Sequence, residues 1–129
     1  MNANRALSAY AAVGVQSGVT DASPHQLISM LFDGAVDRIA AARGAIERGD
    51  KGRQGELLGK AISIIDNLRV SLDQERGGDL ALRLGDLYDY MQRRLLQAST
   101  ESDVAILDEV RSLLKEIKAG WDAIPAEYR

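Results

Sequence analysis

The chain has no cysteine and only one histidine in 129 residues. Without cysteine there are no disulfides, no thiolate nucleophile and no cysteine-based metal centre, which is typical of a reducing compartment. A ferritin-like di-iron centre needs two Glu-x-x-His motifs, so one histidine excludes it. No Gly-x-Ser-x-Gly sequence is present, and His25 follows a proline where a helix is expected to begin. We therefore expect no catalytic residues, no metal site and no cofactor.

Aromatic residues are also scarce, at 5% of the chain, whereas 46% of the residues are hydrophobic. The hydrophobic residues are mostly leucine, alanine and isoleucine, which favours helices over a β-sandwich. Positive charge is not in excess: the net charge of −3 argues against nucleic acid as the main ligand. No apolar run approaches the roughly 20 residues of a membrane span, and no secretory signal is recognised. We expect one cytosolic domain without membrane insertion.

Apolar residues recur every three or four positions in four segments, which predicts four amphipathic helices. Ser23 and Gln26 form a capping box around Pro24, and Gly49 is expected to end the first helix. Asp50 to Gly55 is interpreted as a polar connector. We expect helices at residues 23–48, 55–76, 79–98 and 103–124.

The second and third helices are predicted to form a hairpin around Gly77-Gly78, because glycine adopts positive φ without a steric penalty. Asp79 is expected to cap the third helix, and Ser102 or Asp103 the fourth. Short loops between long helices predict an all-α fold, an antiparallel four-helix bundle over residues 23–125. Residues 126–129 form a tail.

Residues 1–22 are predicted to form a flexible, partly helical N-terminal arm. Leu7 and Tyr10 are spaced to lie on one side of a short helix. A frayed tail and a docking arm are both consistent with this segment.

The apolar stripes of the first three helices are wider than a bundle core needs. The second stripe spans about 160° on a helical wheel of 100° per residue. Wide stripes on neighbouring helices predict a surface groove for an amphipathic partner helix. The candidate binding residues, including the two of the arm, are Leu7, Tyr10, Leu57, Ile62, Ile64, Val70, Leu82 and Tyr90.

Several motifs, in order from Tyr10 to Trp121, resemble the flagellin export chaperones of the FliS family. They are Ala22-Ser23-Pro24-x-x-Leu27-Ile28-x-Met30-Leu31-Phe32-Asp33-Gly34-Ala35, Lys60-Ala61-x-x-Ile64-Ile65-x-x-Leu68, Gly77-Gly78-x-Leu80-Ala81, Leu87-Tyr88-Asp89-Tyr90-Met91-x-x-Arg94-Leu95 and Asp108-Glu109-Val110-x-x-Leu113-Leu114. Phe32 replaces a tyrosine common in the family, and Asp21 replaces a threonine.

This resemblance implies a cytosolic, non-enzymatic chaperone that binds the disordered C-terminal segment of flagellin in surface grooves. It also implies delivery to a component of the flagellar type III export gate, and an arm at Tyr10 that rests over part of the cargo groove. A homodimer in the absence of cargo is a further expectation. A helical adaptor for a folded partner is the alternative function. A cofactor-binding bundle, with haem bound to His25, is the third possible function.

Overall fold

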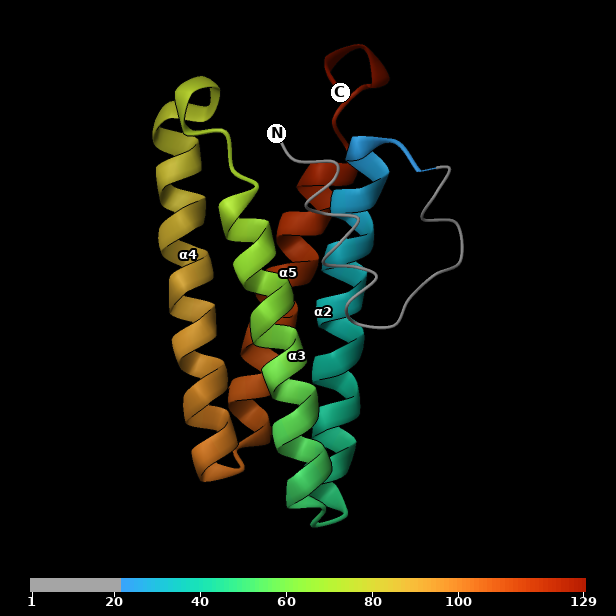
Figure 1. Cartoon of the computed structure of the whole chain (residues 1–129), viewed down its shortest axis with the longest axis vertical. Helices are drawn as coiled ribbons and strands as arrows, with labels where there is room; N and C mark the ends of the chain where they lie inside the picture. Colours follow the sequence, from blue (N-terminus) through green and yellow to red (C-terminus); the bar gives the residue numbers. More distant parts are fainter. Residues whose placement is uncertain (1–21) are drawn as a thin grey trace.

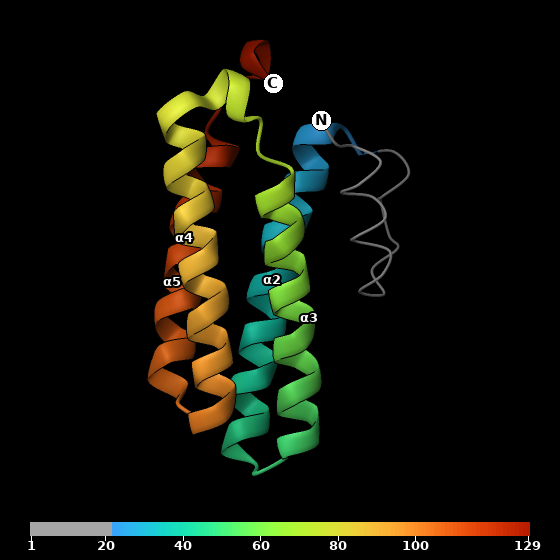
Figure 2. The ribbon, with the colours of Figure 1, turned by 60° about the vertical axis from the view of Figure 1, so that its left-hand side comes forward.

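The computed structural model describes residues 22–129, apart from the side chains of residues 74–76. Its helices are α2 (Pro24–Glu47), α3 (Lys51–Val70), α4 (Gln74–Glu101) and α5 (Val104–Asp122), followed by the short 3-10 helix η1 (Ala126–Tyr128). The long helices run alternately up and down (Figures 1 and 2). Contacts join α2 to α3, α3 to α4, α4 to α5, and α5 back to α2. This ring confirms the predicted antiparallel four-helix bundle.

Local capping signals set several helix ends as the sequence predicts. The Ser23 hydroxyl accepts a hydrogen bond from the Gln26 amide at 3.2 Å, and the Gln26 side chain accepts one from the Ser23 amide at 2.8 Å. The Asp103 carboxylate accepts from the Ala105 amide at 2.9 Å where α5 begins. Gly49 follows the end of α2 with φ of +72°. The capping hydrogen bonds satisfy backbone groups that the helices themselves leave unpaired. The positive φ of Gly49 turns the chain sharply after α2.

The predicted connector before α3 is wrong, because α3 begins at Lys51. Asp50 caps this helix by accepting from the Arg53 amide at 3.0 Å. The first turn is also held by Gln54, which is buried and donates to the Ser99 carbonyl of α4 at 2.9 Å. A tertiary contact of this kind outweighs the low helix propensity of the glycines in the segment. The residues near Gln54 in the sequence give no sign of this contact with Ser99.

The turn between α3 and α4 also differs from the prediction. Helix α3 ends at Val70, and the chain turns at residues 71–73 rather than at the two glycines. Gly77 closes one helical turn by donating to the Asp73 carbonyl at 2.8 Å. Gly78 then kinks α4 with φ of 51° and ψ of −128°, a conformation open mainly to glycine. Asp79 makes no capping hydrogen bond among the described residues, so its predicted role is wrong.

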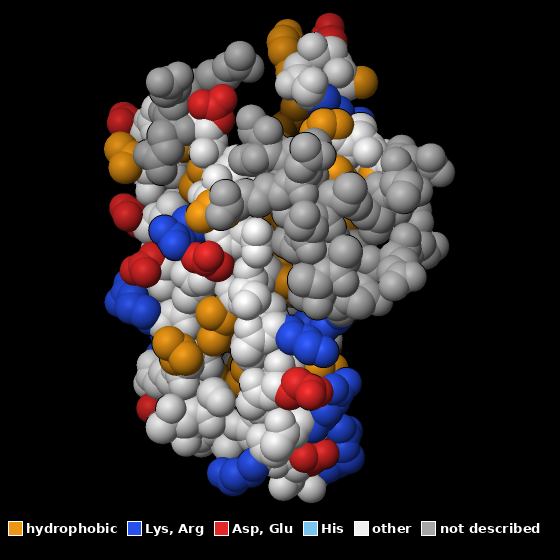
Figure 3. Space-filling view, in the orientation of Figure 1, with side chains coloured by type: hydrophobic (Ala, Val, Ile, Leu, Met, Phe, Trp, Pro, Cys, Tyr) orange, Lys and Arg blue, Asp and Glu red, His pale blue; other side chains and the backbone are white. Residues whose placement is uncertain are grey.

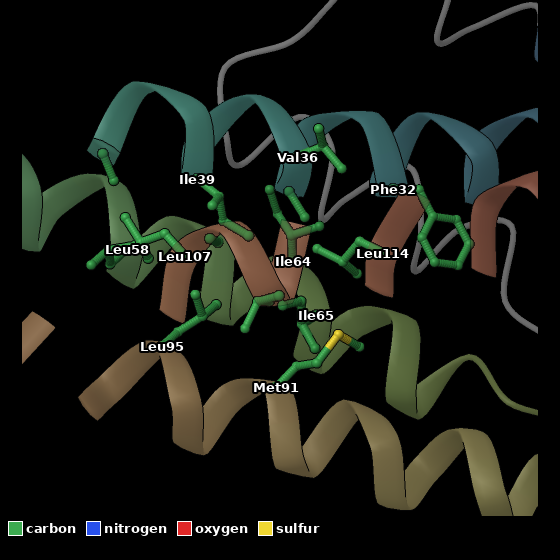
Figure 4. Packing of buried hydrophobic residues seen from close by; sticks show 14 of the residues in the cluster. Phe32, Val36, Ile39, Leu58, Ile64, Ile65, Met91, Leu95, Leu107 and Leu114 are labelled. Atoms are coloured by element: carbon green, nitrogen blue, oxygen red, sulfur yellow. The ribbon is translucent and has the colours of Figure 1, made fainter. Parts of the chain in front are cut away.

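The core lies along the bundle axis, and all four helices contribute to it. Figure 4 shows Phe32 and Ile39 of α2, Leu58 and Ile64 of α3, and partners from α4 and α5 pointing toward one another. Helix α3 packs against both α2 and α4, and this double contact buries its wide apolar stripe. None of the helices in residues 22–129 is both long enough and apolar enough to span a bilayer.

Polar contacts join α5 to both of its neighbours. Arg43 of α2 pairs with Asp108 at 3.0 Å. On the other side, Glu109 accepts hydrogen bonds from the Tyr90 hydroxyl at 2.5 Å and from Arg94 Nε at 3.0 Å. The Tyr90 hydrogen bond, helped by the Arg94 charge, lowers the pKa of the Glu109 carboxyl against the opposing effect of desolvation. These contacts favour the ionised form of Glu109 in the folded protein.

We expect Glu109 to contribute to acid sensitivity. A pKa that is lower in the folded state than in the unfolded state adds stability above the unfolded value of about 4.3, and this stability is lost as the pH falls through the folded value. Between pH 7 and pH 3, the melting temperature of a Glu109→Gln variant should therefore fall less than that of the wild type. Circular dichroism measures both. Asp86→Asn, at an exposed carboxylate, is the control. Equal losses in the wild type and in Glu109→Gln would contradict the assignment.

Candidate functional site

An apolar cavity of about 560 Å³ lies at the end of the bundle where α2 and α4 begin and α3 and α5 end. Leu80 and Tyr128, which are 65% and 75% exposed, lie at its edge. The lining comes from all four helices and the C-terminal residues: Pro24, His25, Ile28, Phe32, Leu68, Ser71, Leu72, Leu80, Leu84, Tyr88, Glu116, Ile117, Gly120, Trp121, Ile124, Tyr128 and Arg129. Its size and lining are typical of a ligand site.

The apolar stripes create this cavity because they continue to the helix ends that meet here. Leu72 lies beyond the last residue of α3, and Leu80 comes just after the kink at Gly78. Toward the opposite end of the bundle, Leu58, Leu95 and Leu107 fill the space between the helices (Figure 4). The core is therefore closed at one end and hollow at the other.

One wall of the cavity is held by a contact between His25 and Trp121. Their rings stack with centroids 4.7 Å apart and planes 8° from parallel. His25 Nε2 donates to the Trp121 carbonyl at 2.7 Å, and Trp121 Nε1 donates to the His25 carbonyl at 2.9 Å. His25 is only 9% exposed, although the first turn of a helix usually leaves a histidine in solvent. The stack fastens the first turn of α2 to the last turn of α5.

Besides the exposed Tyr128, two residues with hydroxyl groups line the cavity. Tyr88 of α4 is 3% exposed, and its ring lies 6.5 Å from that of Phe32. Burial raises the pKa of the Tyr88 phenol above its ordinary value. The Ser71 hydroxyl, at the end of α3, is buried without a hydrogen-bond partner. Buried hydroxyls are normally paired, so the Ser71 group is unusual, whereas the Tyr88 hydroxyl is not among the fully enclosed polar atoms that lack a partner.

Of the predicted binding residues that the structure describes, none lines this cavity. Leu7 and Tyr10 lie outside the described residues. Leu57 and Ile64 are core residues, 3% and 1% exposed, because α3 packs between two neighbours. The remaining candidates are partly or largely exposed, and none lines the cavity: Ile62, Val70, Leu82 and Tyr90. Tyr90 is occupied by its hydrogen bond to Glu109.

Sequence reasoning missed the cavity because it judged each stripe by its width and not by its length. The signal was present in Leu72, Leu80 and Ile124, which continue three stripes to the ends of their helices. In an up-and-down bundle these ends meet, so apolar residues at all of them enclose a common space.

The surface outside the cavity is mixed. In the view of Figure 3, hydrophobic side chains appear in small patches, while charged side chains lie over the lower halves of α2 and α3 and along α4 on the left. Among residues 22–129, no three histidine or acidic side chains come together as a metal site requires. The apolar cavity, rather than the mixed surface around it, is therefore suited to binding an apolar peptide surface.

Comparison with known proteins gives matches over most of the chain. The family described as "Flagellar protein FliS" matches residues 6–128. A Pseudomonas aeruginosa protein named "Flagellar secretion chaperone FliSB" is 50% identical over 124 residues, covering 96% of this chain and 98% of its own length. "Flagellar secretion chaperone FliS" of Salmonella typhimurium is 53% identical over 119 residues, covering 92% and 88%. The Bacillus subtilis protein of that name is 38% identical over 115 residues, covering 88% and 85%.

Proposed function

The chain belongs to the FliS family of flagellar secretion chaperones, and from this premise we propose that its cargo is the C-terminal segment of flagellin. In this proposal the chain binds the segment in the cytosol, keeps it from polymerising and presents it to a component of the flagellar export gate. The chain performs no catalysis. The apolar cavity at the end of the bundle is the observation that carries the proposal, because it offers an unfilled hydrophobic surface to a peptide.

A disordered segment that folds on binding loses conformational entropy, so it must bury a large apolar surface to bind stably. The cavity supplies part of that surface, with Phe32, Leu84 and Ile117 contributing from three helices. The exposed Leu80 extends the apolar surface beyond the mouth. An amphipathic helix could place its apolar face over this region and leave its polar face in water.

The test is a calorimetric titration with the C-terminal segment of the host's flagellin, followed by circular dichroism of the mixture. We expect binding near one to one, a gain of helix and a negative heat-capacity change. Trp121 is the only tryptophan and lines the cavity, so its fluorescence should shift on binding. A scrambled segment of the same composition is the control. No binding by a folded chain would contradict the proposal.

We further propose that the N-terminal arm, with Leu7 and Tyr10, covers the binding surface in the absence of cargo. The support is that the arm joins the bundle at α2, whose first residues, Pro24 and His25, line the cavity. Deleting residues 1–18 should tighten cargo binding, because the cargo no longer competes with the arm, or promote self-association through the uncovered apolar surface. Titration and sedimentation of the truncated chain measure the two effects. If neither changes, the covering role is wrong.

The alternative is an adaptor that binds a folded partner through the same surface. Such a partner would bind with little change in helix content, whereas a disordered flagellin segment gains helix. The dichroism measurement therefore separates the two functions.

A further inference from the structure

Tyr88 differs from the other tyrosines that the structure describes. The Tyr90 hydroxyl donates to Glu109 at 2.5 Å, and Tyr128 is 75% exposed and can bond to water. Tyr88 is 3% exposed and lines the apolar cavity. Within residues 22–129, no group forms a hydrogen bond with its hydroxyl. Its hydroxyl is not fully enclosed, and the residue lines the cavity, so the group is available to a bound molecule.

Resting on the proposed function, we propose that the Tyr88 hydroxyl donates a hydrogen bond to a backbone carbonyl of the bound cargo segment. The bond would be made only in the complex. It would fix how deeply the segment enters the cavity and so select its register, which apolar contacts alone do not specify.

The chemistry of the cavity favours a neutral acceptor. Burial keeps the phenol protonated, so it is available as a donor. A carboxylate would lose its hydration in the apolar lining at a large cost, and Glu116 of the lining would repel it. A backbone carbonyl carries no charge, and the last four carbonyls of a helix have no partner within that helix. The end of a bound helix therefore presents suitable acceptors.

The other polar groups that line the cavity are less suited to donate a hydrogen bond to the cargo. His25 Nε2 already donates to the Trp121 carbonyl, and Arg129 donates to the Ile124 carbonyl at 2.9 Å. The Ser71 hydroxyl is closed off from solvent. Among the described lining residues, Tyr88 is therefore a donor without a partner on a side chain that is only 3% exposed.

The test compares Tyr88→Phe with the wild type in the flagellin-segment titration. Removing an unpaired hydroxyl makes the cavity more apolar, so purely hydrophobic binding would be unchanged or tighter. A specific hydrogen bond predicts the opposite, a Kd raised about fivefold to twentyfold. The melting temperature of the free protein should stay the same or rise, because the hydroxyl has no partner to lose.

Tyr90→Phe is the matched control on the same helix. It should leave the Kd unchanged and lower the melting temperature, because Tyr90 bonds to Glu109 outside the cavity. An unchanged or lower Kd for Tyr88→Phe would overturn the inference while leaving the proposed function in place. A lower melting temperature for Tyr88→Phe would also overturn it, by revealing a partner within the folded chain. If the wild type does not bind the segment, the proposed function fails and this inference with it.

Discussion

Replacing Leu107 with alanine should lower the free energy of unfolding by about 2–5 kcal/mol. Leu107 is fully buried in α5 and points toward Leu58 and Leu95 at the closed end of the bundle (Figure 4). The loss combines the transfer free energy of the deleted methyl groups with the cavity that a packed core cannot refill. Against a total stability of about 5–15 kcal/mol for a domain of this kind, the variant would be severely weakened.

Denaturant unfolding followed by circular dichroism measures this loss. Leu96→Ala is the matched control, because Leu96 lies on α4 but is 58% exposed. Its change should stay within about 0.5 kcal/mol. A Leu107→Ala variant as stable as this control would contradict the packing described for the closed end.

Leu80→Glu should weaken binding of the flagellin segment by about tenfold to a hundredfold, whereas Leu82→Glu should leave it nearly unchanged. A charge at the cavity edge loses its hydration when the apolar segment covers it, and each 1.4 kcal/mol of such cost is a factor of ten. Both leucines are exposed on α4, at 65% and 55%, so neither change should unfold the bundle. Only Leu80 lines the cavity.

This pair decides between two locations for the binding surface. The sequence pattern predicts a groove that includes Leu82, and the structure contains a cavity edged by Leu80. Titration of both variants, with dichroism to establish that each is folded, gives the answer. A larger loss for Leu82→Glu would move the site to the predicted groove and away from the end of the bundle.

Features set by neighbouring residues were predictable from the sequence. The capping box at Ser23, the end of α2 at Gly49 and the cap at Asp103 each depend on residues within one helical turn. The apolar periodicity gave the number of helices and, through the short loops, the up-and-down order.

Features set by contacts between distant residues were not predictable. His25 is buried because it stacks on Trp121, 96 positions away. The first turn of α3 is held by Gln54 bonding across 45 positions to Ser99. The sequence pattern predicts Leu57 and Ile64 as surface residues of a groove because a helical wheel shows a single helix. It does not show the two neighbouring helices that bury α3. The cavity is an intermediate case, because the sequence shows apolar residues at the helix ends but only the assembled bundle brings those ends together.

The ring of contacts described above is closed by its first and last helices, α2 and α5, and this has a consequence for synthesis on the ribosome. The His25–Trp121 pair joins residues that are made far apart in time. Until α5 emerges, α2 has only α3 to cover its apolar face. During that interval the growing chain exposes hydrophobic surface. The newly made chain should therefore be most prone to aggregation before its last helix is complete.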